Sequence, residues 1–273
     1  MNNERRMMNA LRHKSIVRMR SAWGEKDYLY LLYDFALNGD LSSFLRANAP
    51  LKFDTAQYFA AQLVGALAYL RSQRVVHRDI KPANILLNEK WQIQLADFGT
   101  AKIVPASTVS ASSKNRAVSD ISNISSHSAN SQISSVSNDL LKSTNSGNDP
   151  SKISLIQQIP PQEEDIVGTE HYISPEMIDT KQCGYAGDLW AFGVIIYQFF
   201  TGQVPFKGKN QESTFEKIRK GLFEMPKSVP PLAQDLIRKL LTVNPELRLG
   251  TADMHDLMSH KFFDGIDFAT IHD

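Results

Sequence analysis

The sequence predicts an α+β fold in which a mainly helical body follows a short N-terminal part built of strands. Apolar residues recur at helical spacing between residues 55 and 72, which predicts a long amphipathic helix. Residues 186–201 are apolar on nearly every face, as in a helix buried at the centre of a domain. Short apolar runs at 16–23 and 28–33, separated by the turn-like residues 24–27, predict two paired strands.

The other elements follow in order along the chain. Residues 4–11 predict the end of a helix. Asp54, with Gln57 three residues later, predicts a capping box at the start of the long helix. Short apolar strands and further helices are expected at 75–76, 85–87, 93–95, 212–220, 231–241 and 252–259.

The composition is that of a globular protein and excludes several classes of function. The chain has 273 residues, 42% of them hydrophobic, and a net charge of +1. This charge disfavours nucleic-acid binding, which needs clustered Lys and Arg. The single cysteine, Cys183, excludes an intrachain disulfide and a Cys-rich zinc site. The most apolar run, 191–200, is too short to span a bilayer. We expect no membrane-binding segment and a cytoplasmic location.

Residues 105–162 differ from the rest of the chain. Seventeen serines lie among residues 106–162, with almost no aromatic residues and no sustained periodicity. Such a segment buries too little apolar surface to offset the entropy of ordering it. We expect a disordered insertion; a small helical patch at 153–159 is the alternative.

The strongest motif lies at residues 77–84, with the sequence HRDIKPAN. It matches the catalytic loop of protein kinases, in which Asp79 accepts a proton from the substrate hydroxyl and Asn84 binds Mg²⁺. Asp97, the first residue of the sequence DFG, follows 18 residues after Asp79. Two short strands that fold back between the motifs would bring both carboxylates beside the same phosphates. The alternative is a capped turn with a buried histidine and an Arg–Asp pair.

The chain resembles a Ser/Thr protein kinase of the AGC group, and is most similar to the phosphoinositide-dependent protein kinase family. The run DFGTAK at 97–102 and the run GTEHYISPE at 168–176 carry this resemblance. It implies a protein kinase fold with a mainly helical large lobe, a hinge and a truncated small lobe. It also implies ATP and Mg²⁺ as cofactors, and protein substrates that include the activation loops of other AGC kinases. The intact protein could be recruited to the plasma membrane.

The resemblance divides the chain into four parts. Residues 1–35 are the remnant of the small lobe, residues 36–104 and 163–273 form the large lobe, and residues 105–162 are an insertion in the activation segment.

The resemblance assigns a role to each residue of the catalytic machinery. Asp79 orients and deprotonates the hydroxyl, and Lys81 contacts the transferred phosphoryl group, where a cation stabilises developing charge. Asn84 and Asp97 hold Mg²⁺. Thr169 positions the substrate.

Further residues are expected to support the site. By resemblance, Asp188 holds the backbone of the catalytic loop, and Arg248 forms a buried ion pair with Glu176. Phe35 and Ala36 are expected at the hinge, where their backbone groups would contact adenine.

Three further residues are expected near the nucleotide, and each has an alternative interpretation. Asp40 either reaches the ribose or is an exposed helix N-cap. Tyr33 either lies at the back of the adenine pocket or is a core tyrosine bonded elsewhere. Glu4 aligns with the glutamate that pairs with the ATP-binding lysine of the family.

The chain departs from the family in one respect. It contains no G-x-G-x-x-G run and no V-A-I-K-like lysine. Without that lysine, Glu4 is expected to be a solvated charge at a helix end. We expect a fragment of a longer kinase. The alternative is a catalytically impaired pseudokinase or scaffold.

The activation segment suggests two regulatory features. In relatives an activating phosphoserine lies four residues before the equivalent of Thr169, and here Asp165 occupies that position. Asp165 would partly replace the phosphate, with Arg78 and Lys102 as its cationic partners; a solvated acidic loop end is the alternative. Ser119, three residues after an arginine, is a candidate phosphorylation site, and a spacer without regulation is its alternative.

Overall fold

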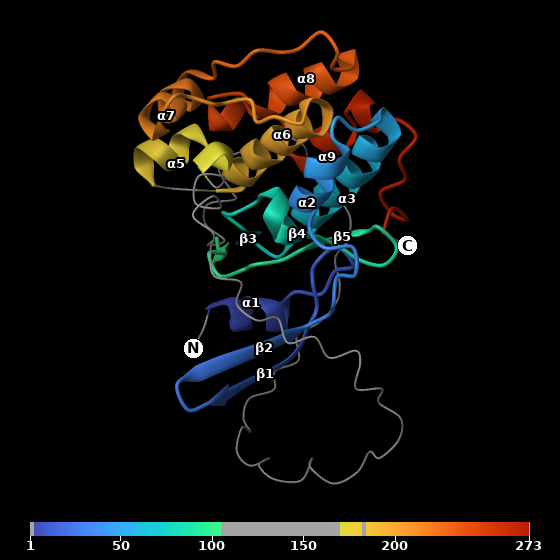
Figure 1. Cartoon of the computed structure of the whole chain (residues 1–273), viewed down its shortest axis with the longest axis vertical. Coiled ribbons are helices and arrows are strands. Elements are labelled where there is room, and N and C mark those ends of the chain that lie inside the picture. Colours follow the sequence, from blue (N-terminus) through green and yellow to red (C-terminus); the bar gives the residue numbers. More distant parts are fainter. Residues whose placement is uncertain (1–2, 105–169, 182–183, 273) are drawn as a thin grey trace, which may run out of the picture.

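The computed structural model describes residues 3–104, 170–181 and 184–272. The predicted insertion, the candidate phosphorylation site Ser119, and the residues Asp165 and Thr169 lie outside the described residues. Figure 1 shows the smaller part of the molecule at one end of the long axis and the helical body at the other. Within the described ranges, none of the helices combines the length and the apolar composition that crossing a bilayer requires.

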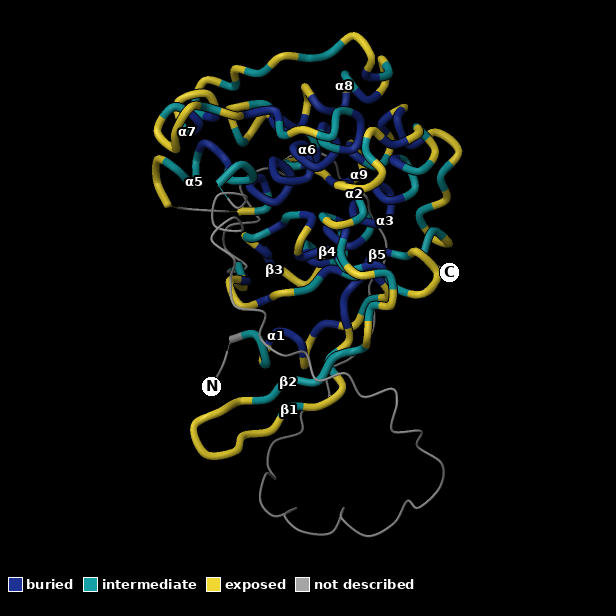
Figure 2. The backbone as a smooth tube through the Cα atoms, in the orientation of Figure 1, coloured by how far each residue is buried: buried dark blue, intermediate teal, exposed yellow. Residues whose placement is uncertain are grey.

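The smaller part contains one helix and a two-stranded ribbon. Its elements are α1 (Asn3–Ala10), β1 (Met19–Glu25) and β2 (Tyr28–Tyr33). The strands pair antiparallel from Glu25↔Tyr28 to Met19↔Tyr33. Figure 2 shows that the outer half of this ribbon is exposed, and Trp23 and Tyr30 stack on it with ring centroids 5.4 Å apart.

The helical body is built around the apolar helix predicted from the sequence. Its helices and 3₁₀ turns are α2 (Leu41–Asn48), α3 (Phe53–Ser72), η1 (Pro82–Asn84), η4 (Glu170–Tyr172), α5 (Pro175–Thr180), α6 (Tyr185–Thr201), α7 (Gln211–Lys220), α8 (Pro231–Leu240), η5 (Pro245–Leu247), α9 (Met254–Met258) and η6 (Lys261–Phe263). Helix α6 packs against α3 and α8. A Cβ on Gly193 would lie 2.8 Å from the Leu240 Cβ, so only glycine permits this close approach of α6 and α8.

Two small antiparallel sheets lie between the ribbon and the helices (Figure 1). They are formed by β3 (Val75–Val76) with β6 (Lys102–Ile103), and by β4 (Ile85–Leu87) with β5 (Ile93–Leu95). The chain returns between β4 and β5 as the motif spacing predicts. Residues 77–84 therefore form the connection from β3 to β4, and Asp97 follows β5 closely.

One prediction at a helix start is wrong. Helix α3 begins at Phe53, with Lys52 at the N-cap and no side-chain cap, so Asp54 lies inside the first turn. The amide of Gln57 does not close a capping box. It donates instead to the backbone oxygens of Phe262, at 2.8 Å, and Asp264. A tertiary contact 205 residues away has taken the side chain that the local pattern assigned to the cap.

Arg248 and Glu176 form a bidentate ion pair that joins the start of α5 to the segment after α8. The guanidinium donates to Glu176 Oε1 at 2.7 Å and to Oε2 at 3.0 Å. The Arg248 side chain is fully buried, and it also donates to the backbone oxygen of Thr242 at 3.1 Å. Burial raises the pKa of Glu176, but the hydrogen bonds and charge of Arg248 outweigh it and leave the pKa below its ordinary value.

Replacing Arg248 by methionine should strand the Glu176 carboxylate and several backbone oxygens without a donor. We expect a loss of about 3–5 kcal/mol in the free energy of unfolding, measured by urea denaturation. Arg238→Met, which changes an exposed arginine of α8, is the matched control and should be nearly neutral. Similar losses for both variants would contradict this account of the pair.

The pH dependence of the pair has a definite sign. The pKa of Glu176 is lowered in the folded state, so its contribution to stability is present at neutral pH and is lost as the pH falls through that pKa. The stability difference between the native protein and the Arg248→Met variant should therefore shrink on acidification.

Candidate active site

The catalytic-loop motif brings two polar side chains to one carboxylate oxygen of Asp79. Lys81 Nζ lies 3.0 Å from Asp79 Oδ2, and Asn84 Nδ2 donates to the same oxygen at 3.0 Å and to the backbone oxygen of Asp79 at 2.9 Å. Pro82 begins the 3₁₀ turn η1, which turns Asn84 back toward Asp79. Because both contacts use Oδ2, Oδ1 of Asp79 is the oxygen that can face an incoming hydroxyl.

A buried carboxylate holds the backbone of this loop. Asp188, in the first turn of α6, accepts from the backbone N–H of His77 at 2.8 Å and of Arg78 at 2.9 Å. Arg78 needs this support because its φ of 71° lies in the left-handed region, which is unfavourable for a long side chain. Burial raises the pKa of Asp188 to about 6, against the opposing effect of the two N–H donors. The carboxylate is therefore ionised at neutral pH.

His77 links the catalytic loop to the segment that carries Asp97. Its Nε2 donates to the backbone oxygen of Ala96 at 3.0 Å, and its Nδ1 accepts from the backbone N–H of Asp79 at 3.3 Å. These partners require a neutral imidazole with the proton on Nε2. Burial lowers the pKa of His77 to about 4, which agrees with the neutral form. The motif spacing gave no signal for this role.

The DFG segment is anchored through its phenylalanine. Phe98 is fully buried and meets the ring of His77 edge to face, with centroids 4.7 Å apart. Asp97 has a φ of 62° and lies at the exposed surface of the site. The backbone N–H of Gly99 lies 3.3 Å from Asp97 Oδ1. A fixed phenylalanine thus holds Asp97 in an unfavourable backbone conformation, which is common at functional sites.

The donor groups at the site fit Mg²⁺. Asn84 and Asp97 offer hard oxygen ligands, and Mg²⁺ is usually bound by one or two carboxylates together with substrate phosphates. In the described parts of the chain, no group of three or more His, Cys, Asp or Glu side chains could hold a metal ion alone. These residues therefore suit an ion that arrives with a phosphate.

The expected hinge connects the ribbon to α2. Phe35 is 61% exposed, and the backbone oxygen of Ala36 accepts from Gly39 N at 3.2 Å. Among the described residues, the backbone N–H groups of Phe35 and Ala36 have no protein acceptor, and their contact with adenine stays a prediction. Asp40 is the N-cap of α2, and its carboxylate accepts from Ser43 N at 2.9 Å. A role for Asp40 at the ribose stays a prediction.

Tyr33 and Glu4 contact each other. The Tyr33 hydroxyl donates to Glu4 Oε1 at 2.5 Å. The expectation that Glu4 is a solvated helix-end charge is therefore wrong, because a partly buried phenol binds its carboxylate. The two residues are 29 positions apart, and no sequence pattern links them.

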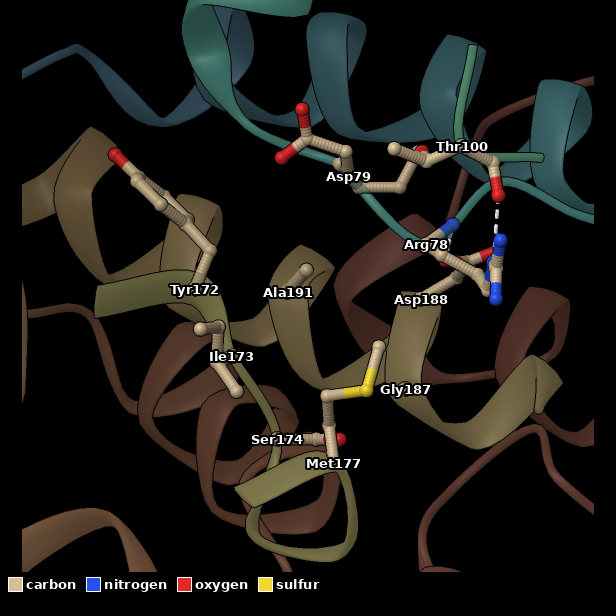
Figure 3. Close-up of a pocket in the computed structure, with 11 residues that line it drawn as sticks. Arg78, Asp79, Thr100, Tyr172, Ile173, Ser174, Met177, Gly187, Asp188 and Ala191 are labelled. Atoms are coloured by element: carbon tan, nitrogen blue, oxygen red, sulfur yellow. Dashed lines mark hydrogen bonds between the residues drawn. The ribbon is translucent and has the colours of Figure 1, made fainter. Parts of the chain in front are cut away.

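A pocket of about 260 Å³ opens beside Asp79 (Figure 3). Its lining residues are Arg78, Asp79, Ile80, Thr100, Tyr172, Ile173, Ser174, Met177, Gly187, Asp188 and Ala191. In Figure 3, Asp79 lies on one side of this space and Ile173, Ser174 and Met177 on the other. The pocket places an apolar surface next to the carboxylate that would receive the hydroxyl proton.

Of the two cations expected to receive Asp165, Arg78 contacts Thr100, which lies two residues before Lys102. Arg78 Nε donates to the backbone oxygen of Thr100 at 2.6 Å, and Lys102 is exposed on β6. Their pairing with Asp165 stays a prediction, as does the role of Thr169.

Replacing His77 by glutamine should make stability less sensitive to acid. The unfolded imidazole binds a proton near its ordinary pKa of 6.5, whereas the folded one does so only near 4. Stability from His77 is therefore present above about pH 6.5 and lost as the pH falls toward 4. The native protein should lose up to about 1.4 kcal/mol per pH unit relative to His77→Gln in this window, measured by urea denaturation at several pH values. A difference that stays constant with pH would refute this role.

Comparison with known protein families agrees with this geometry. A family model described as "Protein kinase domain" matches residues 1–144 and 148–263. The Serine/threonine-protein kinase PKH2 of Candida albicans is 32% identical over 268 residues, which are 98% of this chain and 23% of the relative. The Serine/threonine-protein kinase PDK1 of Cryptococcus neoformans is 32% identical over 97% of this chain and 18% of the relative.

A human protein kinase is also similar to this chain. The 3-phosphoinositide-dependent protein kinase 1 of Homo sapiens is 30% identical over 272 residues, which are 98% of this chain and 40% of the relative. The chain thus spans less than half the length of each of these three relatives. The resemblance predicted from the motifs is confirmed, and because the family model covers almost all of its length, the chain belongs to the protein kinase family.

Proposed function

We propose that this chain belongs to an enzyme that transfers the γ-phosphoryl group of ATP to Ser or Thr hydroxyls of protein substrates. The contact of Lys81 and Asn84 with one oxygen of Asp79 is the observation that carries the proposal. A binding protein has no physical need for a carboxylate, a cation and a metal-binding amide at one point. Phosphoryl transfer needs all three, because it depends on positioning and on charge stabilisation.

Asp79 is the group that orients the nucleophile. Its side chain is 18% exposed, so the carboxylate is accessible but largely shielded from water. Oδ1 accepts the hydrogen bond of the substrate hydroxyl and takes its proton as the new O–P bond forms, while the bond from the γ-phosphorus to the bridging oxygen breaks and ADP leaves. Lys81 and Asn84 hold Oδ2 and so fix the direction of Oδ1.

Lys81 also supplies positive charge near the reacting phosphorus. Its side chain is 20% exposed, and in such a partly desolvated position a cation stabilises developing negative charge more strongly than in water. Asn84 and Asp97 would hold Mg²⁺, which supplies neutralisation of the phosphate charges when it is bound. The hinge backbone at Phe35 and Ala36 would bind adenine.

For substrates, we propose other protein kinases of the AGC group, phosphorylated on their activation loops. The similarity to phosphoinositide-dependent kinases supports this class. A cytoplasmic location fits it, since ATP and such substrates are found there.

A second candidate is a non-catalytic scaffold. These 273 residues contain no G-x-G-x-x-G run and no V-A-I-K-like lysine, the groups that make charge-assisted contacts to the phosphates of ATP. Under this proposal the chain binds partner proteins and transfers no phosphate.

The Asp79→Asn variant tests the enzymatic proposal. Asparagine keeps the size of the side chain but cannot accept the hydroxyl proton, so we expect kcat to fall by about 10²–10⁴-fold with ATP binding nearly unchanged. Transfer of ³²P from ATP to a panel of Ser/Thr peptides, with and without Mg²⁺, measures the rate.

Asp256→Asn, at an exposed position of α9, is the matched control and should keep the native rate. Peptides from activation loops of AGC kinases should be phosphorylated faster than unrelated peptides. Phosphate transfer that does not depend on Asp79 would contradict the role assigned to this residue, and no transfer at all by the native chain would favour the scaffold.

A further inference from the structure

Tyr33 lies between the β1–β2 ribbon and the hinge. It is the last residue of β2 and pairs with Met19 of β1. Phe35 and Ala36 of the hinge follow two and three positions later. A displacement of Tyr33 is therefore transmitted directly to the backbone that would bind adenine.

The phenol of Tyr33 also reaches α1. Its hydroxyl donates to Glu4 Oε1 at 2.5 Å. A bond from a neutral hydroxyl to a carboxylate is shorter and stronger than one between neutral groups. This bond ties a side chain of α1 to the end of β2 without passing through the helical body.

The electrostatic surroundings keep the phenol in the form that donates. Burial raises the pKa of Tyr33, and the hydrogen bond and charge of Glu4, followed by the charge of Asp97, raise it further. Tyr33 is thus protonated throughout the physiological range.

We propose that Tyr33 is a positioning residue of the nucleotide site, whose hydrogen bond to Glu4 holds α1 in a fixed place relative to the hinge. In the described residues a tyrosine thus binds the carboxylate that the resemblance assigns to a lysine. The effect on catalysis rests on the proposed function, whereas the effect on the position of α1 does not.

Hydrogen exchange of the native chain and of the Tyr33→Phe variant tests whether Tyr33 fixes the position of α1. Phenylalanine keeps the ring and removes only the donor. Amide exchange at the C-terminal end of α1, for example of the Leu11 N–H that binds the backbone oxygen of Met7, should accelerate by roughly tenfold to hundredfold, as for loss of a hydrogen bond to a charged group. Tyr30→Phe, on the same strand but stacked on Trp23, is the matched control and should leave α1 unchanged.

A double-mutant cycle with Glu4→Ala tests whether Tyr33 acts through Glu4. If it does, Tyr33→Phe changes exchange in α1 in the native background but not in the Glu4→Ala background. The same cycle applied to kcat/KM for ATP should be equally non-additive, which a merely structural role would not produce.

The possible outcomes separate the two proposals. Unchanged exchange of α1 in Tyr33→Phe, or additive effects in the cycle, would overturn the role of Tyr33. If the native chain transfers no phosphate, the proposed function fails, and the exchange cycle still decides whether Tyr33 positions α1.

Discussion

The site depends on two hydrogen bonds that run from the backbone of the catalytic loop to the carboxylate of Asp188. Helix α6 is the most deeply buried helix of the described chain, and a side chain at its first turn is therefore held firmly. The hydrogen bonds from Asp188 hold the backbone of His77 and Arg78 in place. They thereby stabilise the strained backbone conformation of Arg78. The position of Asp79 thus follows from the packing of a helix that begins 106 residues later in the sequence.

A second set of contacts connects the catalytic loop to the segment that contains Asp97. His77 contacts Asp79 through one ring nitrogen and Ala96 through the other, and Phe98 packs on the same ring. The imidazole must be neutral to make both hydrogen bonds, and its burial favours this neutral form. Asp79 and Asp97 are therefore connected through one buried ring.

The sequence predicts most of the fold and the composition of the site, because both rest on patterns with a short range. The apolar helix around Trp190 and the spacing between Asp79 and Asp97 are of this kind. Features that depend on tertiary contacts could not be predicted. The start of α3 was misplaced because Gln57 binds a distant backbone oxygen. The bond between Tyr33 and Glu4 joins residues that no periodicity relates.

Gly193 shows how this architecture limits the engineering of the protein. Replacing a glycine inside a helix by alanine ordinarily adds up to about 1 kcal/mol of stability. At Gly193 the added methyl group would collide with Leu240 at 2.8 Å and push α8 away from α6. In α3, a methyl group on Gly65 would meet the imidazole of His272, which is held by a 2.7 Å contact with Ser15 Oγ. A thermostabilised variant should therefore seek its helical glycine replacements outside these two contacts.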